Sequence, residues 1–132
     1  MEYDGHSRMK SLLALDITLS AGATTDGNVI DTVDFESLEF TLFTGVYATG
    51  DFDVQLEESD VVTFGGEENI VIADDLIGTP STLSAANALT RIGYKGKKQF
   101  CRLTVLGTDT PDATIAALAV LGRPKTMPVP DQ

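Results

Sequence analysis

The side chains that most often carry catalysis are scarce in this sequence. It contains one histidine, His6, and one cysteine, Cys101. A catalytic nucleophile needs a base beside it, and zinc or iron centres need several Cys or His ligands. One residue of each kind excludes such a metal centre within the chain. A catalytic triad is disfavoured because the single histidine falls in the polar segment expected to form an N-terminal arm. We expect His6 to be solvated in a polar arm, and Cys101 to be a small apolar residue of the core.

Carboxylates are abundant, and they leave two kinds of chemistry to weigh. Close pairs occur at Asp51 and Asp53, Glu57 and Glu58, and Asp74 and Asp75. Facing carboxylates can hydrolyse glycosides, and clustered carboxylate oxygens can bind calcium. The acids at 26–34 do not have EF-hand spacing, and a chain with no Trp and three Tyr offers few platforms for sugars. We predict solvated loop acids, no enzyme activity and no cofactor, and calcium binding by the loops is left open.

Positive charge is concentrated in one short segment, residues 90–106. The formal net charge is −11, and no Lys or Arg occurs between residues 11 and 89. Binding of nucleic acid or of an anionic membrane surface depends on basic residues, so neither partner is expected. The basic segment fits an acidic protein surface instead. The candidate partner-binding residues are Arg91, Lys95, Lys97, Lys98 and Arg102 from this segment, together with Arg123.

The elements that carry these residues are predicted to be β-strands. Apolar residues alternate with polar ones at 13–19, 38–42, 52–56 and 101–105, the period of a half-buried strand. We expect 38–42 and 52–56 to be antiparallel neighbours. Residues 90–106 are expected to form two strands joined by a short turn that contains glycine, and a short β-branched strand at 69–73 is expected to be buried on both faces.

The apolar stretch at 113–121 is ambiguous. Thr110, Pro111, Asp112 and Gly122 are typical start and stop signals of a helix. The regular spacing of the preceding strands favours another strand here, and we predict a strand. About eight strands then result, and two packed antiparallel sheets accommodate them.

The length and the ends of the chain indicate one domain. We expect a flexible arm at 1–10, a β-sandwich at 11–122 and an extended Pro-containing tail at 123–132. The start has no apolar stretch typical of a secretory signal, and no apolar stretch reaches the roughly 20 residues of a spanning helix. We therefore expect synthesis in the cytoplasm.

Several short phrases, in their order and spacing, resemble small proteins encoded beside the major capsid protein of tailed bacteriophages. The phrases are Phe35-Glu-Ser-Leu38, Leu56-Glu-Glu-Ser-Asp60, Ala73-Asp-Asp-Leu-Ile-Gly-Thr79, Arg91-Ile-Gly-Tyr94 with its basic turn, and Val120-Leu-Gly-Arg-Pro124. Over residues 11–126 the chain resembles a capsid decoration, or cement, protein.

This resemblance implies a jelly-roll-like β-sandwich that binds the outside of a phage head, often as a dimer or trimer, and catalyses nothing. The implied partners are the major capsid protein and further copies of the chain. The implied location is the exterior of the virion capsid, after synthesis in the host bacterium. The alternative hypothesis is a phage tail or host-attachment module whose β-sandwich binds carbohydrate, which exposed stacked aromatic rings or a bound calcium ion would favour.

Overall fold

The computed structural model describes residues 6–20, 24–65, 69–78, 82–126 and 129. Within them it contains nine strands and two short 3-10 helices. The elements are η1 (His6–Arg8), β1 (Met9–Ser20), β2 (Thr24–Asp26), β3 (Ile30–Asp31), β4 (Phe35–Ser59), β5 (Asn69–Ile70), η2 (Ala73–Asp75), β6 (Leu76–Ile77), β7 (Thr82–Leu83), β8 (Leu89–Tyr94) and β9 (Phe100–Pro124). The pairings between these strands are antiparallel. The prediction of an all-β antiparallel fold is confirmed. In the described part of the chain, no helix has both the length and the apolar character needed to span a membrane.

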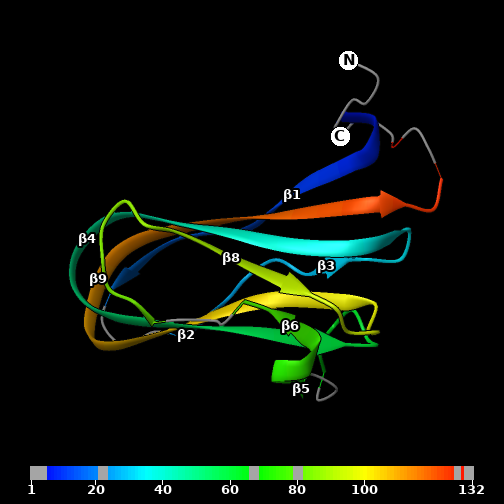
Figure 1. Cartoon of the computed structure of the whole chain (residues 1–132). Coiled ribbons are helices and arrows are strands. Elements are labelled where there is room, and N and C mark those ends of the chain that lie inside the picture. The colour runs from blue at the N-terminus through cyan, green and yellow to red at the C-terminus, as the bar shows by residue number, and fades with distance from the viewer. Residues whose placement is uncertain (1–5, 21–23, 66–68, 79–81, 127–128, 130–132) are drawn as a thin grey trace.

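Two strands of 25 residues each, β4 and β9, organise the molecule (Figure 1). They pair with each other from Phe35 opposite Pro124 to Ser59 opposite Phe100. The register between them shifts three times around Gly50, whose φ of 83° lies in the left-handed region that favours glycine. Both strands bend here, and one continuous sheet folds over into two layers.

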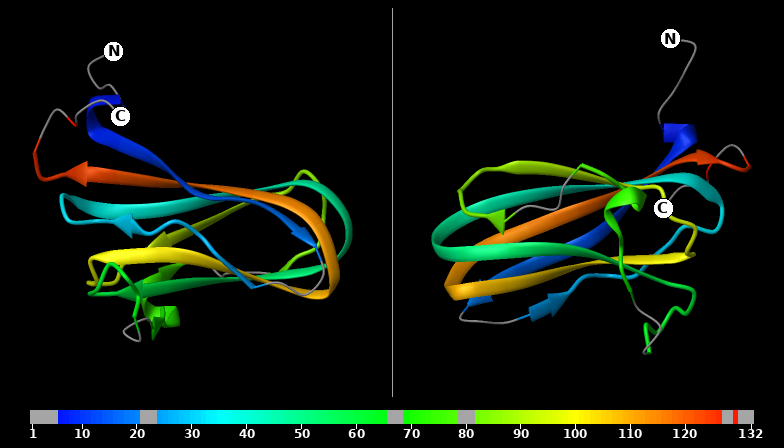
Figure 2. Two further views of the ribbon diagram at one scale, coloured as in Figure 1. Left: turned by 180° about the vertical axis from the view of Figure 1, so that it is seen from behind. Right: turned by 60° about the horizontal axis from the view of Figure 1, so that its bottom comes forward.

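The two layers are called upper and lower; in Figure 1, β1 belongs to the upper layer and β5 to the lower one. The upper layer has the order β1, second half of β9, first half of β4, β8, β6. The lower layer pairs the first half of β9 with the second half of β4, with β2 and β3 beside β9 and with β5 and β7 beside β4. Figure 2 shows the two layers joined by the bends of β4 and β9 at one end of the molecule.

The core fills the space between the layers. The alternating runs of the sequence supply it, since every second residue of a strand points to the same face. The inward side chains of the upper layer include Leu38, Phe40, Leu42, Ile92, Ile115 and Leu121, and those of the lower layer include Ile30, Phe52, Leu56, Cys101, Leu103 and Val105. The prediction that Cys101 is a buried core residue is confirmed, and so is the strand at 113–121, which lies within β9.

The predicted pairings of neighbouring strands were wrong in two places. Segments 38–42 and 52–56 are not antiparallel neighbours, because they are the two halves of β4 and lie in different layers. Segment 90–106 is not a hairpin either, because β4 separates β8 from β9. Alternation tells which face a residue occupies, but it does not tell which strand lies alongside.

The segment at 69–73 also differs from its prediction as a strand buried on both faces. Only residues 69–70 form a strand, β5, and Ile70 and Ile72 are more than half exposed. Val71 alone in this segment is buried among the described side chains, and its N–H donates to the Leu56 carbonyl at 2.9 Å. A β-branched composition therefore marks an extended segment here without marking a central position in the sheet.

One open side of the sandwich is closed by residues 27 and 28. The Gly27 N–H donates to the Leu103 carbonyl in the lower layer at 2.7 Å, and the Asn28 N–H donates to the Ala14 carbonyl in the upper layer at 2.7 Å. The Asn28 side-chain amide also donates to the Leu13 carbonyl at 2.9 Å. This contact coincides with a register shift in β1 between Leu13 and residue 15, so it covers the middle of an edge strand.

The two ends of the chain lie partly outside the described residues. Residues 1–5, 127–128 and 130–132 are among those not described. β1 begins at Met9 and β9 ends at Pro124, and the N–H of Val129, which is buried, donates to the Ser7 carbonyl at 3.1 Å. The flexible arm at 1–10 and the extended tail at 123–132 stay predictions.

Candidate binding surfaces

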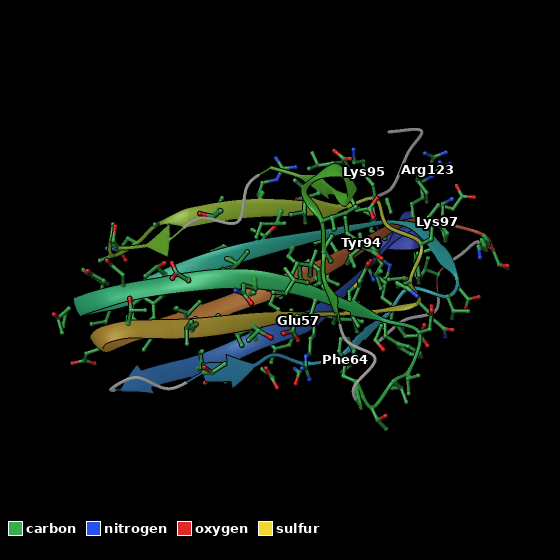
Figure 3. The ribbon with its side chains drawn as sticks, turned by 90° about the horizontal axis from the view of Figure 1, so that it is seen from below. Glu57, Phe64, Tyr94, Lys95, Lys97 and Arg123 are labelled. Carbon is green, nitrogen blue, oxygen red and sulfur yellow. The ribbon has the colours of Figure 1, made fainter. Side chains whose placement is uncertain are left out.

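The six cations predicted to bind a partner do not form one patch. Arg91 lies on the outer face of the upper layer, and Arg102 lies on the outer face of the lower layer. Lys95, Lys97 and Lys98 lie in the connection between β8 and β9, called here the basic turn (residues 95–99). Arg123 lies near the end of β9. Figure 3 shows Lys95, Lys97 and Arg123 at the same end of the molecule.

The charge of Arg91 is neutralised within the chain. Its Nε and Nη2 atoms donate to the two carboxylate oxygens of Glu39 at 2.8 and 2.6 Å. This paired hydrogen bonding holds the pKa of the Glu39 carboxyl below its ordinary value. The pair crosses from β8 to β4 on the outer face.

Arg102 is built into the lower layer. Its Nε atom donates to Glu57 at 2.7 Å, and its Nη1 atom lies 3.3 Å from an Asp26 carboxylate oxygen. Its guanidinium lies 4.4 Å from the centre of the Phe64 ring, within the range of a cation–π contact. Phe64 has a φ of 52°, in the left-handed region, and its side chain is buried. The contact with the Arg102 guanidinium holds the Phe64 ring in place. Arg102 therefore anchors the loop after β4.

Two further cations have acidic partners. Lys98 forms an ion pair with Asp60, and Arg123 lies 3.5 Å from Glu36. Both pairs are exposed at the surface, where a single ion pair contributes little to stability, about 0–1 kcal/mol. They nevertheless reduce the positive charge that each of these residues presents to a partner.

The basic turn is wrapped around the ring of Tyr94. The Tyr94 hydroxyl donates to the Glu58 carboxylate at 2.5 Å and accepts from the Lys98 N–H at 3.0 Å. A Cβ atom on Gly96 would lie 2.3 to 2.4 Å from the Tyr94 hydroxyl and ring, so only glycine fits there. The Lys95 N–H donates to the Asp75 carbonyl at 2.7 Å. The turn is thus held at both of its ends.

Lys95 and Lys97 are the two exposed cations of this turn for which no ion pair is found within the described residues. Lys95 also lines an open groove of about 860 Å³ on the outer face of the upper layer, with Met9, Ile77, Gly93, Tyr94 and Gly122 among the other lining residues. A Cβ atom on Gly93 would lie 3.0 Å from the Ile77 side chain, and one on Gly122 would lie 2.7 Å from Ser37 Oγ, so neighbouring side chains pack against both glycines. The basic turn therefore offers two lysines from a fixed backbone at one end of an acidic molecule.

A second surface was not foreseen from the sequence. On the outer face of the upper layer, Leu13 of β1 lies opposite Leu118 of β9, and in the next row Phe43 of β4 lies opposite Leu89 of β8. All four side chains are exposed. We call Leu13, Phe43, Leu89 and Leu118 the apolar face. Only the register of the strands shows that they are neighbours, since they come from four separate strands.

The outer face of the lower layer is acidic. Its outward side chains include Asp26, Asp51, Asp53, Gln55, Glu57, Arg102 and Thr104. Several of these oxygens already accept hydrogen bonds, such as Asp26 from Thr104 at 3.1 Å. Within the described ranges, no group of three or more Cys, His, Asp or Glu is placed to hold a metal ion.

The buried polar cluster around Tyr94 is structural in character. Burial, the largest cause, raises the pKa of the Cys101 thiol to about 12. Burial also raises the pKa of Tyr94, with the hydrogen bond to Glu58 as the next cause. Both groups are therefore neutral at physiological pH. A buried neutral thiol is a poor nucleophile, as expected for a core cysteine.

Comparisons with known proteins give one similarity in structure. The chain matches no protein-family model, and no curated protein matches it. A chain in the structure of infectious bursal disease virus, Gx strain, is similar with a TM-score of 0.46 and 16% sequence identity. The match covers 92% of this chain and 35% of that one, so this chain spans about a third of the viral chain's length. At this identity and TM-score, the likeness carries no information about function.

Proposed function

We propose that this chain is a non-enzymatic structural protein that binds the outer surface of a bacteriophage head and stabilises it. The observation that carries the proposal is the pair of lysines, Lys95 and Lys97, on a basic turn fixed by Tyr94. The rest of the molecule is acidic, with a formal charge of −11 for the chain. The resemblance of its short phrases to capsid decoration proteins gives the partner class: the major capsid protein, through an acidic surface on the head.

The fixed backbone of the turn matters for such contacts. An exposed ion pair contributes only about 0.2–1 kcal/mol and is weakened by salt. Two lysines on an ordered turn lose less conformational freedom on binding than two lysines on a mobile loop. Connected copies of this chain can bind neighbouring sites of the capsid lattice at the same time, and their binding free energies then reinforce one another. Synthesis in the bacterial cytoplasm and residence on the exterior of the virion belong to this proposal.

The test replaces both lysines by glutamine. The Lys95→Gln/Lys97→Gln variant should bind heads of the encoding phage, prepared without this protein, about fivefold or more weakly in a pelleting assay at low salt. The difference from the parent should shrink as salt is added, because the lost contacts are electrostatic.

The matched control removes the same net charge at the opposite end. Ser84→Asp/Ala86→Asp lowers the charge by two units in the exposed segment beside Asn87, whose N–H donates to Gly45 in the bent part of β4. This control should bind as the parent does. Equal binding by the parent and the glutamine variant at low salt would show that the basic turn is not the contact.

The carbohydrate-binding alternative has no specific support among the described residues. Phe43 is the aromatic among their exposed large apolar side chains, and it stands with aliphatic neighbours. A sugar platform would need further exposed rings beside it.

A further inference from the structure

Asp26 and Gly27 form a dipeptide whose backbone can rearrange without an enzyme. Glycine has no Cβ atom, so its amide nitrogen is little hindered and can attack the side chain of a preceding aspartate. Asp-Gly occurs twice in the chain, at Asp4–Gly5 and at Asp26–Gly27. The first pair lies outside the described residues. The second lies where β2 ends and the chain bridges the two layers, so the fold decides how readily it reacts.

The rearrangement is an isomerisation that needs only water. The Gly27 nitrogen attacks the carboxyl carbon of Asp26, and the carboxyl OH leaves as water together with the Gly27 N–H proton. Water then opens the resulting five-membered imide at one of its two carbonyl carbons. Opening at the original main-chain carbonyl leaves the backbone running through the Asp26 side chain, as isoaspartate. One water leaves and one enters, so atoms and electrons balance.

The folded chain keeps the two reacting groups apart. The Gly27 N–H donates to the Leu103 carbonyl at 2.7 Å, which fixes the nitrogen and its peptide plane. The Asp26 carboxylate is held against β9, where it accepts from the Thr104 hydroxyl at 3.1 Å and lies 3.3 Å from Arg102 Nη1. The backbone of Asp26 is paired with Thr104 as well. The carboxyl carbon has to leave these partners before it can reach the Gly27 nitrogen.

The rearranged backbone does not fit between the layers. Isoaspartate lengthens the main chain by one methylene between positions 26 and 27. The structure has no slack there, because a Cβ atom on Gly27 would already lie 2.5 Å from the Ala14 carbonyl oxygen and 2.9 Å from the Leu103 carbonyl oxygen. The extra carbon also displaces the Gly27 and Asn28 N–H groups that donate to these two oxygens. The layers then lose their connection on this side of the sandwich.

We propose that Asp26–Gly27 is a site of spontaneous isoaspartate formation, which the folded chain suppresses and which prevents an opened chain from folding again. In the folded chain the reaction proceeds only through local opening of residues 24–28. Opening breaks the hydrogen bonds donated by the Gly27 and Asn28 N–H groups, so the reaction should be at least about 25-fold slower than in the unfolded chain, about fivefold for each bond. The inference does not depend on which partner the protein binds.

The test ages the parent at neutral pH, folded in buffer and unfolded in guanidinium chloride, in water labelled with oxygen-18. The protease Asp-N cuts before aspartate but not before isoaspartate, so one digest reports on both Asp4 and Asp26. Mass spectrometry detects the heavy oxygen that each opened imide has taken up. In the unfolded chain the two sites should react at similar rates. In the folded chain Asp26 should react at least about 25-fold more slowly than it does unfolded.

Three variants complete the experiment. Asn28→Ala and Thr104→Val each remove one hydrogen bond that holds the segment closed, so each should raise the folded-state rate at Asp26 by about fivefold and leave the unfolded-state rate unchanged. Asp26→Glu is the control, because its longer side chain would have to close a six-membered imide, which forms far more slowly. After ageing in denaturant and return to buffer, this control should regain the circular dichroism of its fresh sample, whereas the parent should regain it only in proportion to its unmodified Asp26.

Two results would overturn the proposal. Equal rates at Asp26 in the folded and the unfolded parent would show that the fold does not protect the site. Chains with isoaspartate at position 26 that refold as completely as aged Asp26→Glu would show that the connection between the layers accepts the longer backbone. Neither measurement involves phage heads, so failure here is distinct from failure of the proposed capsid binding.

Discussion

At the scale of residues, Tyr94 joins the core of the β-sandwich to its surface. Tyr94 presents its ring to the core and its hydroxyl to Glu58 and to the Lys98 N–H. Cys101, which is fully buried, belongs to the same core cluster as Tyr94. The same tyrosine therefore completes the core and fixes the basic turn. Gly96 is the counterpart of Tyr94, because any side chain there would collide with the ring.

The buried thiol gives a pH dependence at this scale. The pKa of Cys101 is about 12 in the folded chain, whereas an unfolded thiol ionises near its ordinary pKa of about 8.5. Between these values the unfolded chain releases a proton that the folded chain retains. Rising pH therefore favours unfolding, by at most about 1.4 kcal/mol per pH unit for this one group.

Urea unfolding at intervals from pH 7 to 10 measures this effect. The free energy of unfolding of the parent should fall as pH rises above about 8.5. In Cys101→Ala the starting stability should be lower, but the fall between about pH 8.5 and 10 should be smaller. Parallel curves for the two proteins would mean that the thiol ionises equally in both states.

At the scale of elements, the connection between β2 and β3 is tightly constrained by both layers. A Cβ atom on Gly27 would lie 2.5 Å from the Ala14 carbonyl oxygen and 2.9 Å from the Leu103 carbonyl oxygen. These oxygens accept from Asn28 and Gly27 and belong to different layers. Gly27 thus allows the backbone to pass between two layers that it also joins.

Gly27→Ala should lower the free energy of unfolding by about 3 kcal/mol, since neither carbonyl can move without breaking a hydrogen bond between elements. Asn28→Ala removes only the side-chain bond to Leu13, so it should cost about 1 kcal/mol. Chemical denaturation of the two variants beside the parent measures both values. A neutral Gly27→Ala would show that the layers are not held together at this point.

The strands, and the face of the sheet that each residue occupies, could largely be predicted from the sequence. Which strands lie side by side could not. The alternation at 38–42, 52–56 and 101–105 correctly predicted the core residues, because burial on one face is a local pattern. The pairing of strands depends on the bend at Gly50, which has the composition of a turn although β4 continues through it. The apolar face could not be predicted, because Leu13 and Leu118 become neighbours only through a pairing over a hundred residues apart. Four of the six cations predicted to bind a partner protein form ion pairs within the chain. These ion pairs could not be predicted either, because their members are far apart in the sequence.

We expect the molecule as a whole to unfold as one cooperative unit, because β4 and β9 each cross both layers. Each layer contains one half of β4 and one half of β9. One layer is therefore not expected to unfold while the strands of the other layer stay paired. Calorimetry of this protein should therefore show one transition, with equal calorimetric and van't Hoff enthalpies. Two separate transitions would show that the layers are independent.

The position of β9 after its partner strands in the sequence also has a consequence for synthesis. β1, β2, β3 and β4 all form pairs with β9. The partners of β2 and β3 are translated by residue 106, whereas those of β1 and of the first half of β4 follow only at residues 112–124. At about 5–20 residues per second, the interval between completion of β4 and completion of β9 lasts several seconds. During that time Phe40, Phe52 and their neighbours are exposed on the nascent chain. The acids that alternate with them, such as Glu39 and Asp53, then keep unfinished chains apart on the polysome.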